Sequence, residues 1–67
     1  MKETVRRIVK RHPEVIGHEI KNQKLYLGYV GSSVSGTTLM DFVNNFGYKI
    51  GIRFLPIGEF NAKFQNS

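Results

Sequence analysis

The chain has 67 residues, 40% of them hydrophobic, no cysteine, and a formal net charge of +5 from ten Lys or Arg against five Asp or Glu. This length predicts a single domain, residues 1–67, with a marginal core, since a chain of about 60 residues buries only about 60% of the surface that its unfolded form exposes. The lack of cysteine excludes a disulfide framework and a zinc–thiolate site, so association with a second copy is the ordinary way left to reinforce the core.

Hydrophobic content and charge also limit the location and the partners of the protein. The apolar residues are too numerous for a disordered tail and form no run near the ~18 that a membrane span needs. The basic first residues are not followed by the apolar stretch of a signal peptide. We therefore expect a cytoplasmic protein without membrane contact. Because residues 1–24 hold seven of the ten Lys and Arg, a nucleic acid or another polyanion is the expected partner.

The first predicted element is a helix that ends before Pro13. Val5, Ile8 and Val9 are spaced i, i+3 and i+4, as on one face of a helix, and a proline disfavours helical backbone at the residue before it. The opposite arc of this helix carries only positive charge, on Arg6, Arg7, Lys10 and Arg11. A solvated surface and a phosphate-contacting surface both fit this arc, but only phosphate contact explains why all four charges have one sign.

The segment 14–31 supports two interpretations, and the fold class depends on which is right. In the first, Leu25, Leu27 and Tyr29 alternate as residues of a strand do, which predicts a hairpin that turns at residues 21–23. Local propensity slightly favours this hairpin. Its turn is poor, however, because no glycine occupies a position that needs a positive φ.

In the second interpretation the same segment forms two helices. Ile16, Gly17 and Ile20 would face inward on one helix, and Leu27 and Val30 would anchor the other. The small residue between two apolar ones lets the helices cross closely, although a glycine inside the second helix costs about 1 kcal/mol. Residue spacing favours this pair of helices.

Residues 37–56 change from a helical to an extended apolar period. Leu39, Phe42, Val43 and Phe46 are spaced i, i+3, i+4 and i+7, which predicts a helix with these residues on its inner face. A strict alternation follows, which predicts a half-buried strand. Its apolar positions are Tyr48, Ile50, Ile52 and Phe54.

Taken in series, these elements resemble the Cro/repressor-type helix-turn-helix family, and in particular short phage repressors and DNA-binding antitoxins. The resemblance covers residues 4–56 and is most specific at the end, where a helix, the pair Gly47–Tyr48, an alternating strand and Pro56 follow one another. In the turn, Lys21–Asn22 stands where the family has a glycine and an apolar residue. The resemblance implies a mainly α helix-turn-helix domain with a C-terminal strand and a tail, residues 57–67. The alternative is an α+β fold in the order helix–strand–strand–helix–strand.

The resemblance also implies which residues contact double-stranded DNA. The expected set on and around the recognition helix is Asn22, Gln23, Lys24, Gly28, Tyr29, Ser32 and Ser33. Gln and Lys side chains can read base edges, whereas the basic arc Arg6, Arg7, Lys10 and Arg11 would contact the phosphate backbone. The strand is implied to pair with its twin in a homodimer, through Tyr48, Ile50, Ile52 and Phe54.

No enzymatic constellation is apparent in the sequence. His12 and His18 are six residues apart without a paired carboxylate or cysteine, and the Gly31–Gly36 segment lacks the lysine of a phosphate-binding loop. We therefore expect a protein that is not an enzyme and has no cofactor and no metal.

Three functional hypotheses follow from these patterns. The leading one is a dimeric, sequence-specific DNA-binding transcriptional repressor of phage, plasmid or antitoxin type. The alternative is a small phage- or plasmid-encoded α+β protein that binds and inhibits a host protein. The third is an RNA-binding protein that stacks bases on Tyr26, Tyr29 and Tyr48.

Overall fold

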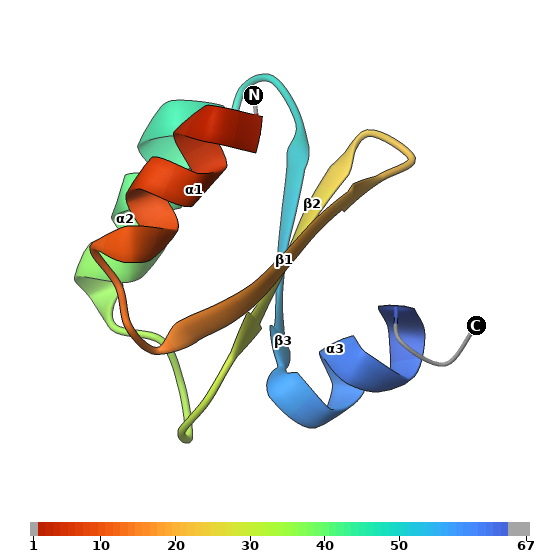
Figure 1. Ribbon diagram of the computed structural model, residues 1–67. Coiled ribbons are helices and arrows are strands. Elements are labelled where there is room, and N and C mark those ends of the chain that lie inside the picture. Colours follow the sequence, from red (N-terminus) through yellow and green to blue (C-terminus); the bar gives the residue numbers. More distant parts are fainter. Residues whose placement is uncertain (1, 65–67) are drawn as a thin grey trace.

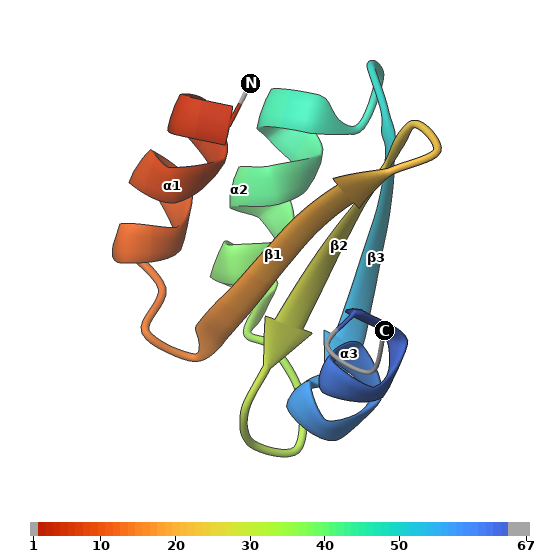
Figure 2. The same ribbon diagram turned by 45° about the vertical axis from the view of Figure 1, so that its right-hand side comes forward.

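The computed structural model describes residues 2–64 and contains three helices and one three-stranded sheet (Figure 1). The elements are α1 (Lys2–Lys10), β1 (Val15–Lys21), β2 (Lys24–Tyr29), α2 (Gly36–Phe46), β3 (Gly51–Pro56) and α3 (Ile57–Phe64). The sheet has the order β1-β2-β3, with β2 antiparallel to β1 and parallel to β3. Helices α1 and α2 lie side by side on one face of the sheet, and α3 lies on the other (Figures 1 and 2).

The prediction of a mainly α helix-turn-helix domain is wrong. The segment 14–31, which was to supply the two helices of that motif, forms the antiparallel hairpin β1–β2. The fold is α+β in the order helix–strand–strand–helix–strand–helix. It contains the hairpin of the alternative interpretation and adds α3, which occupies most of the segment predicted as a tail; the last tail residues, 65–67, lie outside the described part of the chain.

The hairpin turns through two residues that both have positive φ. Asn22 has φ of 52° and Gln23 has φ of 62°, and the flanking Lys21 and Lys24 are paired in the ladder. Two consecutive positive φ angles are the mark of a type I′ turn, whose twist matches that of the strands. A glutamine at such a position is uncommon. The strand residues that follow the turn are buried in the sheet. Their pairing therefore imposes on Gln23 a positive φ that its local propensity disfavours.

The apolar core lies between the sheet and the layer formed by α1 and α2. The stripe predicted for the first helix faces this core, and Val5 and Ile8 are almost fully buried. The core residues are Val5, Ile8, Val15, Leu25, Leu27, Phe42, Phe46 and Ile50. Among residues 2–64, no helix combines the length and the apolar character that crossing a membrane requires.

The inner face of α2 differs by one position from the predicted face. The helix buries Thr38, Phe42 and Phe46, spaced i, i+4 and i+8. Leu39 and Val43, predicted to face inward, are 41% and 39% exposed. The helix is therefore rotated so that a threonine enters the core region and two aliphatic side chains meet solvent.

Helix α3 packs on the opposite face of the sheet through Phe60. Gly17 and Gly28 are paired across β1 and β2, and the Phe60 ring lies directly over this glycine pair. A Cβ at Gly28 would be 2.8 Å from Cγ of Phe60 and 2.9 Å from Cδ1 of Ile57. The two glycines thus form a notch that only a residue without a side chain leaves open.

The notch predicts that Gly28→Ala destabilises the protein by about 1–2 kcal/mol, because the added methyl group overpacks the contact with α3. Gly58→Ala is the matched control: it lies in α3 itself, and its added Cβ would meet nothing within 4 Å. We expect this control to stabilise the helix by about 0.5–1 kcal/mol. Urea unfolding of both variants measures the difference. Equal stabilities would contradict the close packing of Phe60 on the sheet.

Candidate functional site

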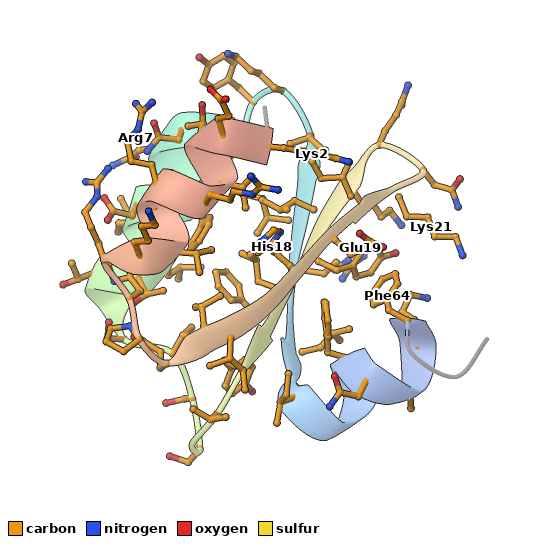
Figure 3. The ribbon with its side chains drawn as sticks, viewed as in Figure 1. Lys2, Arg7, His18, Glu19, Lys21 and Phe64 are labelled. Atoms are coloured by element: carbon orange, nitrogen blue, oxygen red, sulfur yellow. The ribbon has the colours of Figure 1, made fainter. Side chains whose placement is uncertain are left out.

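The outward face of α1 is the most strongly charged surface of the protein. Half of the ten basic residues lie on or directly after this nine-residue helix, and all of them are exposed. They are Lys2, Arg6, Arg7, Lys10 and Arg11, hereafter the basic face of α1. The only acidic residue of the helix is Glu3 in its first turn. Figure 3 shows Arg7 directed away from the sheet into solvent.

Some charges of the basic face repel one another along the helix. Lys2 and Arg6, and also Arg6 and Lys10, are like-charged neighbours four residues apart, and each such pair destabilises a helix by about 0.2–0.5 kcal/mol. Lys2 also lies at the positive end of the helix dipole. Within residues 2–64 no carboxylate lies within ion-pair distance of the basic face. Arg7 and Lys10 lie in the last turn, where the helix dipole favours positive charge, so the unfavourable part is the charge at Lys2 and the repulsion within the two pairs.

The other residues predicted to contact DNA do not form one surface. Lys24 begins β2 and Ser32 lies beyond its end, so the six-residue strand separates them by about 20 Å. Figure 1 shows the β1–β2 turn and the β2–α2 loop at opposite ends of the sheet. Gly28 is buried beneath Phe60, and Tyr29 is half-buried at the end of β2. The recognition helix that was to hold these residues is absent, and Ser33 lies with Ser32 in the loop.

Gln23 and Lys24 keep an exposed position. Together with Asn22 they occupy the tip of the hairpin and the first residue of β2. Figures 1 and 2 show this tip at the same end of the molecule as the start of α1. These three side chains are therefore the members of the predicted set that a ligand of the basic face can reach.

The residues predicted to form a dimer seam are mostly used inside the subunit. Ile50 belongs to the core, and Ile52 and Phe54 pack against it. The ring of Phe54 meets that of Phe42 edge-on, with 5.9 Å between centroids. Tyr48 is 78% exposed, in the turn between α2 and β3. Since β3 is an edge strand of the sheet, pairing of its backbone with a second copy stays a prediction.

A polar network that the sequence did not reveal joins the end of α1 to the start of α2. The buried imidazole of His12 contacts Oδ2 of Asp41 through Nε2 at 2.6 Å and Oγ1 of Thr38 through Nδ1 at 3.0 Å. The Thr38 hydroxyl also donates to Oε2 of Glu14 at 2.5 Å and lies 2.9 Å from Oγ of Ser35. Ser35 is the N-cap of α2, and its side chain accepts the backbone N–H of Thr38. The network therefore holds two helices in one arrangement.

Both ring nitrogens of His12 face hydrogen-bond acceptors. The single hydroxyl proton of Thr38 points to the carboxylate of Glu14, so Oγ1 can only accept from Nδ1 of His12. Nε2 faces the carboxylate of Asp41, which also only accepts. Each ring nitrogen of His12 therefore faces an oxygen that can accept a hydrogen bond, and the contact with Asp41 is an ion pair when the ring is protonated.

The hydrogen bond that the Glu14 carboxylate accepts from the Thr38 hydroxyl lowers the pKa of Glu14 below its ordinary value of 4.5. Its own backbone N–H and the positive charge of His12 act in the same direction. Thr38 itself is completely buried, so its hydroxyl is inaccessible to a substrate. The network is consequently a positioning device for α1. In the described part of the chain, no three His, Asp or Glu side chains gather as the ligands of a metal ion would.

The sequence offers only a faint signal for this network. That signal is Ser35, a residue type that is common at an N-cap and stands directly before the start of the helix. His12 and Asp41, by contrast, are 29 residues apart and meet only through the tertiary fold. Comparison of the chain with protein-family models, curated proteins and solved structures finds no match, so its function has to be inferred from its own residues.

Proposed function

We propose that the protein binds duplex DNA and that the basic face of α1 lies along the phosphate backbone. The observation that carries this proposal is the concentration of positive charge on α1, which has no ion-pair partner within residues 2–64. A nine-residue helix is about 13 Å long. Duplex DNA carries a negative charge about every 1.7 Å of its axis, so a rigid row of cations of this length meets several phosphates.

Phosphate contacts fix the position of a protein on DNA, but they do not read its sequence. Any base-specific contact would come from the exposed hairpin tip, where Gln23 can bond adenine and Lys24 can donate to guanine. A protein of this size that occupies a DNA site would act as a transcriptional regulator by excluding other proteins, which is the repressor role proposed here.

The proposal predicts a steep salt dependence that belongs to α1. Fluorescence anisotropy with a labelled duplex at several salt concentrations should give a log–log slope near −0.9 for each phosphate neutralised. Arg7→Gln/Lys10→Gln should weaken binding to all sequences and reduce the slope by about 2, about 1 for each residue removed.

Arg53→Gln/Lys63→Gln is the matched control for this titration. It removes the same net charge from the opposite side of the sheet: Arg53 is paired with Tyr26, whose ring contacts Phe64 of α3, and Lys63 lies in α3. We expect it to leave the slope nearly unchanged. Absence of binding at low salt, or equal losses in the two double variants, would contradict the proposed role of α1.

A second candidate function, binding to another protein, is favoured by the outward face of α2. Leu39, Met40 and Val43 are exposed there, and the helix contains no basic residue. A complex formed through this face would persist at about 1 M salt, where surface charges are screened beyond about 3 Å. A complex formed through α1 would dissociate under the same conditions. Salt resistance of a purified complex therefore separates the two functions.

A further inference from the structure

A groove between α1 and β1 gathers basic side chains from both elements. It has a volume of about 120 Å³ and is lined by Lys2, Val5, Arg6, His18, Glu19 and Ile20. Lys2 and Arg6 are four residues apart and thus share one side of α1. His18 belongs to β1 and is half-buried. Two elements that are separate in the sequence thus supply the three basic groups of one groove.

The acidic residue that lines the groove, Glu19, directly follows His18 on β1. Successive side chains of a strand point to opposite faces. Figure 3 shows His18 on the side of β1 that faces α1, and Glu19 and Lys21 on the opposite side, near Phe64 of α3. Within residues 2–64, the His18 ring has no hydrogen-bond partner, and neither Lys2 nor Arg6 has an ion-pair partner. The groove therefore gathers hydrogen-bond donors and positive charge, and its one acidic residue, Glu19, forms no ion pair with Lys2 or Arg6 within residues 2–64.

We propose that Lys2, Arg6 and His18, hereafter the α1–β1 anion site, bind a single phosphate group. In the complex with DNA this group is one backbone phosphate, a detail that rests on the proposed function. The guanidinium of Arg6 offers a planar fork of donors and Lys2 a compact ammonium group, which are the two common ways that proteins hold phosphate. A bound phosphate would also cancel the repulsion between Lys2 and Arg6.

His18 makes this site dependent on pH. A histidine changes its charge between about pH 5 and 8, and the protonated ring donates from both nitrogens. The charged groups around it are Lys2 and Arg6 on α1 and its neighbour Glu19, while its partner on β2 is the uncharged Leu27. Lys and Arg stay protonated and Glu stays ionised over most of this range. Protonation of His18 therefore adds the only protein charge that changes at the site. A backbone phosphodiester, whose own charge is constant over this range, should bind more tightly at low pH.

The direct test uses inorganic phosphate as the probe. Two-dimensional NMR of the histidine ring nitrogens at pH 6 should show the signals of His18 moving as phosphate is added, while those of His12 stay in place. His12 lies in the polar network, where both of its nitrogens already have partners. His18 signals that stay unchanged up to a large excess of phosphate over the protein would overturn the anion site.

The second test compares duplex binding at pH 6 and pH 8. The unchanged protein should bind about tenfold more tightly at the lower pH, as expected for a gained charged hydrogen bond. His18→Gln should remove this difference and keep the salt dependence. Lys21→Gln, on the far side of the same strand, is the control and should keep the pH difference.

The outcomes of the two tests separate this inference from the proposed function. Salt-dependent duplex binding with the same pH dependence in His18→Gln would overturn the anion site and leave DNA binding in place. Movement of the His18 signals with phosphate, without any duplex binding, would support the anion site with free phosphate as its ligand and overturn the proposed function. Movement of the His18 signals with phosphate, together with duplex binding whose pH dependence His18→Gln removes, would support both the anion site and DNA binding.

Discussion

Phe42→Ala is expected to lower the free energy of unfolding by about 3–5 kcal/mol, the range for truncating a buried aromatic side chain. Phe42 is completely buried, and its ring lies between those of His12, Phe46 and Phe54, at centroid distances of 6.3, 6.5 and 5.9 Å. Domains are commonly stable by only about 5–15 kcal/mol, and a short one lies near the lower end. Circular dichroism during urea titration should therefore show a protein that is close to unfolded without denaturant.

Val43→Ala is the control that makes this prediction specific to the observed orientation of α2. Residues 42 and 43 are neighbours, and the sequence pattern placed both on the inner face. In the structure Val43 is largely exposed, so we expect its truncation to cost less than about 1 kcal/mol. Similar losses in Phe42→Ala and Val43→Ala would show that α2 is rotated relative to the structure described.

The elements that the sequence predicted correctly have local signals. The first helix follows from the stripe Val5, Ile8 and Val9 and ends before Pro13, all within thirteen residues. The change from helix to strand after residue 46 is equally local. Helix α2 lies where it predicts a helix, whereas β3 begins at Gly51, three residues after the predicted start at Tyr48. Periodicity of this kind depends only on which residues are apolar, so it needs no knowledge of the remaining chain.

The error in the fold arose where the decisive contacts are remote. Gly17 was interpreted as the small residue of two crossing helices, and Gly28 as a cost within a helix. The structure pairs the two glycines across β1 and β2 and covers them with Phe60, from the segment predicted as a tail. The turn residues Asn22 and Gln23 accept positive φ because the strands pair on either side of them. The Phe60 contact comes from outside residues 14–31, so that segment alone does not contain it.

The contrast between local and remote causes also applies to the candidate site. The basic face of α1 could be predicted because one sign of charge recurs within a single helix. The orientation of α2 could not be predicted, because Thr38 is turned inward by hydrogen bonds with His12 and Glu14, which are 26 and 24 residues away. The position of His18 opposite Lys2 likewise depends on how α1 packs on β1. Tertiary contacts therefore decide which of the predicted residues a ligand can reach.

Thr38→Val should destabilise the protein by about 2–3 kcal/mol, although it changes the shape of the side chain very little. The variant removes the hydrogen-bond partner of Nδ1 of His12, a buried polar atom that is then left without a partner. Ser35 and Glu14 lose a partner as well. Thr37→Val, the adjacent and exposed position of α2, is the matched control and should change the free energy of unfolding by less than about 0.5 kcal/mol.

The effect of Thr38→Val should also depend on pH. The hydrogen bond from Thr38 is the main cause of the lowered pKa of Glu14, which otherwise lies at 4.5. A carboxyl group with a lowered pKa in the folded state stabilises the protein above its unfolded pKa, and this contribution is lost as the pH falls through the folded pKa. The gap in unfolding free energy between the unchanged protein and Thr38→Val should therefore be widest near neutral pH and narrow below about pH 4.5.

Urea unfolding of both proteins between about pH 3 and pH 7 measures this gap. Because all other carboxyl groups are the same in the two proteins, their shared loss of stability in acid cancels in the difference. A gap that stays constant over this range would mean that Glu14 does not depend on Thr38. The connection between the end of α1 and α2 would then rest on the contacts of His12 with Asp41 and Thr38, without Glu14.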